Sequence, residues 1–399
     1  MGFFEATRTA SKGAPQSLLP KCGACGFYTR CESPKIGVMG EGRRGVLIIS
    51  DEITSEDDAR GDHLTGDAGR LLRRSLALIG INLDRDCWRT SALICNASDD
   101  ITPKHVSYCR PNLTKILADL KPRLIIPFGS LAVLSLLSPL WKENTGSIEQ
   151  WAGWKIPLQR MNAWVCPTYH PAYVVDAKDD REGAVVQLWF DRHLKAAFQL
   201  IGRPWEEVPD YQKQIRIVMD PREVASQLKD WVRDGGAMAF DYETNRLQPD
   251  PADAEIVCAS VCWRGRDTIA FPWVGEAVEA MGRFLRSKVP KVGANNKFEE
   301  RWTRRILGHG VRNWVWDTMV SAHHLDCRPN ITSVKFQAFV RLGQEEWGWA
   351  VAPYLKSTDE NGLNRIREVD TRTLLVYCGV DSLVEFHIAG QQKKEMLCR

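Results

Sequence analysis

The stretch Ala239–Thr244 constrains the fold of this chain most strongly, because it combines a buried strand with two carboxylates. It reads Ala-Phe-Asp-Tyr-Glu-Thr, with glycines before it and a polar, proline-containing loop after it. Successive side chains of a strand alternate between faces, so we expect Asp241 and Glu243 on one face and Phe240 and Tyr242 on the other. Two carboxylates at this spacing can hold one divalent ion. The triplet alone is weak evidence, and it gains weight from acidic residues further along the chain.

The length of the chain, 399 residues, predicts two or three domains. We expect a loose N-terminus at 1–20, a first domain at 21–203, a linker with two prolines at 204–212 and a second domain at 213–399. Hydrophobic and charged contents of 44% and 26% are typical of a globular protein, and we expect no membrane span. The N-terminus lacks the apolar core of a signal peptide, which favours a cytoplasmic location. A net charge of +3 does not by itself indicate nucleic-acid binding.

The first half of the chain alternates strands with helices. Apolar strands are predicted at 46–49, 123–129 and 163–167, and helices at 68–80 and 130–137. This alternation predicts a parallel α/β layer whose sites lie beyond the carboxyl ends of its strands. Asp51 and His170 occupy two such ends.

The cysteines of the first half predict a metal centre. Twelve cysteines in a cytoplasmic chain are expected to be thiols rather than disulfides. Cys22 and Cys25 form a Cys-x-x-Cys pair, and Cys95 and Cys109 can complete a four-thiolate shell for zinc or an iron–sulfur cluster. Buried free cysteines are the alternative, above all for Cys95 and Cys109.

Several motifs of the first half also occur in a recognisable order. They are Cys22-x-x-Cys25, Gly40-x-Gly42, Ser50-Asp51-Glu52, Gly61-x4-Gly66-x-x-Gly69-x-Leu71-Leu72, Cys95, Cys109-Arg110-Pro111 and His170-Pro171-Ala172. In order and spacing they resemble the iron–sulfur uracil-DNA glycosylases of family 4, over roughly residues 20–200. The resemblance implies a structural [4Fe–4S] cluster held by Cys22, Cys25, Cys95 and Cys109, with Cys31 as a substitute ligand and Zn²⁺ as the alternative to the cluster.

The uracil site departs from the pattern of that family. Asp51 lies where the family has a glycine- and proline-containing loop, Leu64 replaces the aromatic residue that stacks on uracil, and Ser91 replaces the asparagine that reads its edge. His170 is retained. Stacking and edge hydrogen bonds hold an extruded base in such enzymes. We therefore expect an inactive DNA- or partner-binding module, and the alternative is an active uracil-DNA glycosylase combined with an exonuclease in DNA repair.

The second half adds further acids to the pair on the central strand. Glu299 lies at a predicted helix start, with Glu300 as the alternative if the register slips, and Tyr377 and Asp381 lie one turn apart on a helix. Four carboxylates from separate elements would repel one another without cations. Two Mg²⁺ or Mn²⁺ ions about 4 Å apart support phosphodiester hydrolysis, with Tyr377 positioning the attacking water. Unrelated surface acids and a core tyrosine are the alternative.

These residues fall into motifs that carry a second resemblance. The motifs are Asp241-x-Glu243-Thr244, Val292-Gly293-x-Asn295-x-Lys297-Phe298-Glu299, Trp316-Asp317-Thr318 and Tyr377-x3-Asp381. Over roughly residues 213–395 they resemble the 3′–5′ proofreading exonuclease domain of family A DNA polymerases, the type with tyrosine in its third motif. The resemblance implies a ribonuclease-H-like mixed sheet and a metal-dependent exonuclease acting on single-stranded 3′ DNA ends, in which Asp317 caps or braces the fold.

The resemblance also bears on partners. The chain ends at Arg399, after the third motif, whereas some phage polymerases resemble a fusion of a glycosylase-like domain, this exonuclease and a polymerase. We therefore expect a separately encoded DNA polymerase as a replication partner, in the host cytoplasm if the chain is phage-encoded. Residues 301–305 and 345–354 are candidate docking surfaces, or else solvated face and core. A non-catalytic replisome scaffold remains an alternative.

Overall fold

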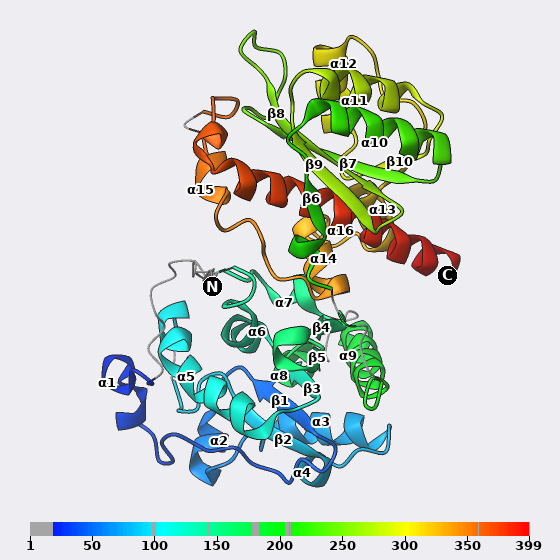
Figure 1. The fold of residues 1–399 in the computed structure, drawn as a ribbon. Helices are drawn as coiled ribbons and strands as arrows, with labels where there is room; N and C mark the ends of the chain where they lie inside the picture. Colours follow the sequence, from blue (N-terminus) through cyan, green and yellow to red (C-terminus); the bar gives the residue numbers. More distant parts are fainter. Residues whose placement is uncertain are drawn as a thin grey trace, which may run out of the picture. The chain divides into compact units, whose positions relative to one another are not determined.

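The computed structural model describes residues 19–97, 101–142, 144–177, 183–203, 207, 209–357 and 359–398. The expected loose N-terminus lies almost entirely outside these residues, as does part of the expected linker. The chain divides into two compact units. The N-terminal unit comprises Gln16–Glu207 and Phe339–Glu345, and the C-terminal unit comprises Val208–Ala338 and Glu346–Arg399. Each unit is built around its own sheet (Figure 1).

The N-terminal sheet has five strands in the order β2-β1-β3-β5-β4. Strands β2 (Cys87–Ser91), β1 (Val46–Ser50), β3 (Leu124–Pro127) and β5 (Ala163–Val165) are parallel, and β4 (Ile156–Leu158) pairs antiparallel with β5. Every residue of β1 is buried, since helices cover both faces of a parallel sheet. The predicted parallel α/β layer is confirmed.

The helices of this unit lie before, between and after its strands in the sequence. They are α1 (Cys22–Cys25), α2 (Ser55–Arg60), α3 (Asp67–Ala77), α4 (Leu83–Asp86), α5 (Pro103–Leu120), α6 (Ser130–Leu137), α7 (Ile148–Trp151), α8 (Pro171–Asp176) and α9 (Gly183–Phe198), with 3₁₀ turns at Phe27–Thr29 and Gln159–Met161. The predicted helix at 130–137 is confirmed, and α3 begins one residue before its prediction. Within the unit, Phe339 packs on Trp141 and Trp151.

The C-terminal sheet has six strands in the order β11-β10-β7-β8-β9-β6. Strands β7 (Met238–Thr244), β8 (Ile256–Trp263) and β9 (Asp267–Pro272) form an antiparallel meander. Strands β10 (Lys291–Gly293) and β11 (Trp314–Asp317) extend it in parallel with β7, and β6 (Ile215–Ile217) pairs in parallel with β9. This is the predicted ribonuclease-H-like mixed sheet, so the fold class is confirmed.

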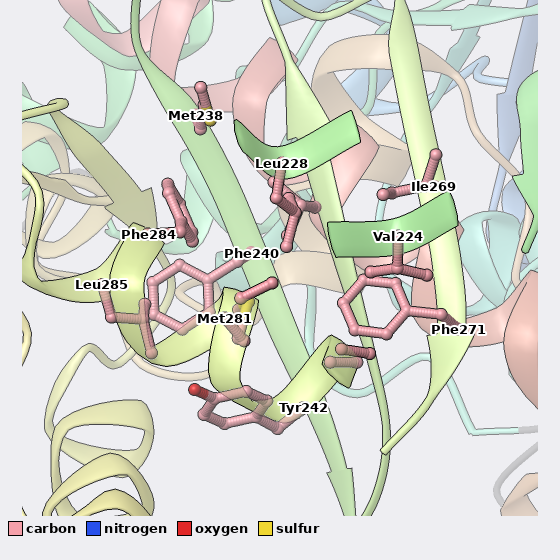
Figure 2. Close-up of a cluster of buried hydrophobic side chains, with 14 of the residues drawn as sticks. Val224, Leu228, Met238, Phe240, Tyr242, Ile269, Phe271, Met281, Phe284 and Leu285 are labelled. Carbon is pink, nitrogen blue, oxygen red and sulfur yellow. The ribbon is translucent and has the colours of Figure 1, made fainter. Parts of the chain in front are cut away.

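The two faces of the C-terminal sheet have different coverings. Helices α10 (Pro221–Asp234), α11 (Glu276–Arg286) and α12 (Lys297–Leu307) bury one face, and Figure 2 shows Phe240 and Tyr242 within that apolar core. The predicted alternation along β7 is therefore confirmed. Asp220 caps α10, since its carboxylate accepts a hydrogen bond from the N–H of Arg222. The remaining elements are α13 (Thr318–Leu325), α14 (Val334–Leu342), α15 (Ala352–Leu355) and 3₁₀ turns at Tyr211–Gln214 and Ile366–Glu368.

Helix α16 (Thr371–Leu397) crosses the opposite face of the sheet (Figure 1). The hydroxyl of Ser260 on β8 donates to the carbonyl of Cys378 and lies 2.8 Å from the hydroxyl of Ser382, which fixes the helix against the strands. Contrary to the expectation from sequence, α16 is long and apolar enough to cross a membrane by length and composition. Most of that apolar stretch is buried inside the protein, as expected for a core helix.

Candidate functional sites

The carboxylates of β7 lie on the face that α16 covers. Asp241 pairs with Ser260 across the sheet and Glu243 with Cys258, while the neighbouring Phe240 faces the apolar core. The thiol of Cys378, on α16, donates to the carbonyl and the carboxylate of Asp241, each at 3.7 Å. The strand and the helix together therefore hold Asp241 in place.

The first turn of α12 supplies the next acid. Glu299 is 4% exposed, and its Oε2 has no hydrogen-bond partner among the described residues. Glu300 belongs to a different environment, because it forms an ion pair with Arg304 and accepts hydrogen bonds from the N–H of Val311 and the indole of Trp314. The structure thus places Glu299, and not Glu300, beside Asp241.

Helix α16 supplies Tyr377, Asp381 and a further acid, Glu385, at successive turns of one face. These three residues, together with Asp241, Glu243 and Glu299, surround a pocket of about 660 Å³ that we call the carboxylate pocket. Its other lining residues are Ala294, Asn295, Phe298, Met319, Ser333 and Val334. All five residues predicted for the exonuclease chemistry therefore meet at one point.

Burial and mutual repulsion raise the pKa values of these acids. Burial raises the pKa of Asp381 to about 7, and the positive charge of Lys335 opposes that rise. The pKa values of Asp241, Glu243 and Glu299 are raised by burial and then by the charges of neighbouring carboxylates. A divalent cation would relieve both effects, because it favours the ionised form of each acid.

One group of side chains in the carboxylate pocket has the geometry of a metal site. Ligand atoms of Asp241, Glu243 and Cys378 lie within 4.8 Å of one another, the only such group among the described residues. Carboxylate oxygens suit Mg²⁺ and Mn²⁺, whereas a thiolate suits softer metals. The thiol of Cys378 donates to Asp241, so the oxygen ligands fit a hard divalent ion best.

Sequence reasoning missed the basic side of this pocket. Lys335, on α14, forms an ion pair with Glu346 at 3.0 Å, and its Nζ lies 4.8 Å from the ring centroid of Tyr377. Its charge lowers the pKa values of Asp241, Glu243 and Asp381. No periodicity or motif in the sequence singles out Lys335, because only tertiary contacts bring it close to the acids.

The predicted docking segment 345–354 is divided in the structure. Glu346 and Trp347 are buried beside Lys335, whereas Trp349 is half exposed. At Gly348, an added Cβ would lie 3.1 Å from the Tyr377 ring and 2.3 Å from the Lys335 ammonium. This part of the segment thus packs against Lys335 and Tyr377.

Asp317 braces the loop that carries the pocket residues. Its carboxylate accepts hydrogen bonds from the backbone N–H groups of Asn295 and Asn296, and from those of Met319 and Val320 at the start of α13. Four N–H donors satisfy the two oxygens. The predicted bracing role is confirmed.

A second pocket adjoins the first. This basic pocket, of about 380 Å³, is lined by Leu247, Pro249, Asn295, Lys297, Phe298, Arg301 and Trp302. It shares Asn295 and Phe298 with the carboxylate pocket. Of the predicted basic stretch at 301–305, Trp302 lies in the apolar core and Arg301 pairs with Asp250 at the surface. Lys297 and Arg301 give this pocket the sign of charge that attracts a phosphate backbone.

The four predicted cysteine ligands meet in the N-terminal unit. Cys22, Cys25, Cys95 and Cys109 line a cavity of about 350 Å³, the cysteine pocket, together with apolar residues. The N–H of Lys35 donates to the sulfur of Cys95, and the amide of Asn112 donates to that of Cys109. Cys31 does not line this cavity, and its thiol donates to the carbonyls of Phe27 and Asn96.

The spacing of these sulfurs favours a cluster over one zinc ion. Four thiolates at about 2.3 Å from Zn²⁺ would lie within about 4 Å of one another. Among the described residues, no three of the cysteine-pocket sulfurs come within 4.8 Å of one another. An iron–sulfur cluster holds its cysteines further apart and accepts N–H bonds at sulfur, so the residues present fit a cluster.

The third group of predicted residues corresponds to the glycosylase site, and two of its members, Asp51 and His170, follow β1 and β5. The Asp51 carboxylate accepts a hydrogen bond from the N–H of Ala132 at 2.7 Å, in the first turn of α6. Gly129 permits this approach, because its φ is +87° and an added Cβ would lie 2.1 Å from the Asp51 carboxylate. Burial raises the pKa of Asp51 to about 7. Asp51 thus caps a helix.

The positions that correspond to the uracil site are also occupied by internal contacts. Leu64 is 3% exposed and belongs to the apolar core. The hydroxyl of Ser91 lies 2.9 Å from Nδ1 of His63, whose Nε2 donates to the carbonyl of Gly37. Sequence reasoning missed His63, although it precedes Leu64 directly. Neither Leu64 nor Ser91 is placed to hold a flipped base.

His170 caps α8. Its Nδ1 accepts the N–H of Ala172 at 3.2 Å, and its Nε2 lies 2.8 Å from the hydroxyl of Ser50. Burial lowers the pKa of His170 to about 4. The ring is therefore neutral near pH 7, with both nitrogens hydrogen-bonded.

Comparison with known proteins supports the division between the units. Residues 39–192 match the model of the uracil DNA glycosylase superfamily. The type-4 uracil-DNA glycosylase of Pyrobaculum aerophilum is 28% identical over 164 residues, which cover 40% of this chain and 81% of that protein. The N-terminal unit is uracil-DNA-glycosylase-like, as the sequence predicts.

A second relative extends past this region. The DNA polymerase of Bacillus phage SP01 is 21% identical over 325 residues, covering 73% of this chain and 33% of the polymerase. Among solved structures, the catalytic core of RRP6 from Trypanosoma brucei is 15% identical, with a TM-score of 0.36, and the alignment covers 46% of this chain and 48% of that one. The chain thus spans a third of the phage polymerase and about half of the RRP6 core. The C-terminal unit is therefore similar to part of a phage DNA polymerase.

Proposed function

We propose that this chain is a metal-dependent 3′–5′ DNA exonuclease that proofreads for a separately encoded DNA polymerase. The observation that carries the proposal is the carboxylate pocket, where acids from β7, α12 and α16 meet, and where Oε2 of Glu299 and of Glu385 is buried with no hydrogen-bond partner in the described part of the chain. Unrelated surface acids would not converge in this way, because bare carboxylates repel one another.

The residues present fit two divalent ions. Asp241, Glu243, Glu299 and Asp381 would hold Mg²⁺ or Mn²⁺ through hard oxygen ligands. When bound, such ions lower the pKa of a nucleophilic water and stabilise the leaving oxygen of a phosphodiester.

The chain's own residues supply the other parts of the reaction. Tyr377 lines the carboxylate pocket on the face that carries Asp381, so its hydroxyl would orient the attacking water. Lys335 packs on the Tyr377 ring, restricts its movement and places a positive charge near the scissile phosphate. Glu346 holds the lysine in that position.

The substrate strand would enter through the basic pocket. Phe298 offers an aromatic face shared by both pockets, and Lys297 and Arg301 offer charge to the phosphates. Base stacking on aromatic side chains and a basic groove are the usual means of binding a single strand without sequence preference. A frayed 3′ end would thereby reach the acids.

The glycosylase-like unit would serve as an inactive DNA- or partner-binding module. Its Cys22, Cys25, Cys95 and Cys109 would hold a [4Fe–4S] cluster of structural role. Similarity to a phage DNA polymerase across both units supports a polymerase as the partner.

The test is degradation of a 5′-labelled single-stranded DNA by the full chain in Mg²⁺, Mn²⁺ or EDTA. We expect stepwise shortening from the 3′ end with either metal and none in EDTA, and loss of the activity in Asp381→Ala. RNA of the same sequence, run in parallel, defines the preferred substrate. Equal degradation by wild type and Asp381→Ala would overturn the proposal.

A further inference from the structure

Glu385 is an acid of the carboxylate pocket that none of the sequence motifs includes. It lies on α16 one turn beyond Asp381, is 4% exposed and lines the pocket with Asp241 and Glu299. Glu385 lies about four turns from the N-terminal end of α16, among other residues of that helix that are buried in the C-terminal unit.

The oxygens of Glu385 point to a missing partner. Its Oε2 is buried and has no hydrogen-bond partner among the described residues, and the same holds for Oε2 of Glu299. A buried carboxylate oxygen without a partner is costly, and nearly all such groups in proteins are satisfied. Two of them lining one pocket call for a shared cation.

Lys335 does not fill that role. Its ammonium pairs with Glu346 at 3.0 Å and lies over the ring of Tyr377, so it serves the side of the pocket that carries the tyrosine. Asp317 is itself an acid, and its oxygens already accept four backbone N–H groups, so it brings no positive charge to Glu299 or Glu385. Within the described residues, no hydrogen-bond donor reaches Oε2 of Glu299 or of Glu385.

We propose that Glu385 is a further metal ligand, sharing one divalent cation of the Mg²⁺ or Mn²⁺ class with Glu299. Helix α16 would then supply two ligands one turn apart, Asp381 and Glu385. The assignment rests on the proposed metal-dependent function and adds a fifth carboxylate to its ligand set. Oxygen ligands alone suit these hard ions.

The experiment is calorimetric titration of the full chain with Mn²⁺ alone. Glu385→Gln keeps the shape of the side chain and removes its charge, Glu385→Asp keeps the charge and withdraws the carboxylate by one methylene, and Glu279→Gln is the control. Glu279 is an exposed acid of α11 paired with Arg283, remote from the pocket lining.

We expect both Glu385 variants to bind Mn²⁺ at least about tenfold more weakly than wild type or to lose one binding event, and Glu279→Gln to match wild type. Wild-type binding by Glu385→Gln would overturn the inference and leave the proposed function standing. Weak binding by Glu385→Gln with wild-type binding by Glu385→Asp would show an effect of charge alone and would overturn direct ligation. A wild-type chain that binds no Mn²⁺ overturns the proposed function and the inference together.

Thermal unfolding supplies a readout that does not depend on activity. In EDTA, Glu385→Gln should melt at or above the wild-type temperature, because a buried unpartnered charge is removed. In Mn²⁺, its rise in melting temperature should be smaller than that of wild type, since binding to the folded state is what stabilises it. An equal Mn²⁺-dependent rise in both proteins would contradict ligation by Glu385.

Discussion

The polar residues at strand ends of the N-terminal unit and the acids of the carboxylate pocket in the C-terminal unit differ in how their hydrogen bonds are satisfied. In the N-terminal unit, Asp51 caps α6, His170 caps α8, and Ser91 is bonded to His63. In the C-terminal unit, Glu299 and Glu385 keep buried oxygens without partners. Buried polar groups are normally paired within the protein, so the unpaired group marks a place for a ligand. The comparison teaches that buried polar groups can be satisfied within the protein, as in the N-terminal unit, or left for a ligand, as we propose for the carboxylate pocket.

The largest expected effect tests the C-terminal half of this comparison. Glu243→Gln should lower the rate of 3′–5′ degradation by about 10²–10³-fold, because it removes a negative ligand oxygen from the carboxylate pocket. Steady-state degradation of labelled single-stranded DNA measures the loss, with Glu279→Gln as the matched exposed control. Full activity in Glu243→Gln would show that the carboxylate pocket does not carry the reaction, and the contrast with the internally hydrogen-bonded residues of the N-terminal unit would be lost.

The second prediction concerns the cysteine pocket. Cys25→Ser should abolish the visible absorbance expected of an iron–sulfur cluster and lower the thermal stability of the N-terminal unit, because metal binding contributes directly to folding. Cys31→Ser should retain the absorbance, since that thiol bonds to backbone carbonyls. Absorption spectra and iron analysis of anaerobically purified protein decide the matter. Loss of iron in Cys31→Ser but not in Cys25→Ser would reverse the assignment.

The third prediction uses pH. Asp51 and Asp381 each have a pKa raised from 3.8 to about 7, so the folded state holds their protons more strongly than the unfolded state does. Each therefore lowers stability as pH rises from about 4 to about 7, with no further change above. Asp51→Asn should reduce this decline, on the order of a few degrees in melting temperature, with or without Mn²⁺.

Asp381→Asn should reduce the same decline only without Mn²⁺, because bound metal takes the place of the proton on that carboxylate. Melting temperatures across this pH range, in EDTA and in Mn²⁺, measure the difference between the two aspartates. An identical response of both variants to Mn²⁺ would show that Asp381 binds metal no more than Asp51 does, although Asp51 is satisfied by a helix N–H and Asp381 lines the carboxylate pocket.

The smallest expected effect is on uracil excision. Leu64 lies in the core and the Ser91 hydroxyl is bonded to His63, so neither is placed to hold the base. We expect no abasic sites in uracil-containing single-stranded DNA, and no change in His170→Asn. Alkaline cleavage of a labelled strand, with nuclease activity suppressed by EDTA, provides the assay. Excision that disappears in His170→Asn would restore the repair alternative.

Local sequence patterns predicted the elements that depend on local physics. The apolar run at 46–49 and the helix at 130–137 need only neighbours in the chain, and the structure has both. Strand β2 and helix α5 were not predicted. β2 mixes polar and apolar residues because its burial comes from pairing with β1, and α5 contains Pro111, which breaks the usual helical pattern.

The sequence by itself determined which acids and thiols are available, their order along the chain and the two faces of β7, because alternation and spacing are properties of the backbone. Tertiary structure decided which groups remain without partners. Glu385 lines the carboxylate pocket, and Lys335, with Glu346 and Trp347 beside it, lies next to Tyr377, only through packing of distant segments. A motif cannot show whether a carboxylate is capped by an amide, as Asp51 is, or left for a cation, because that depends on which donors the fold brings within hydrogen-bonding distance.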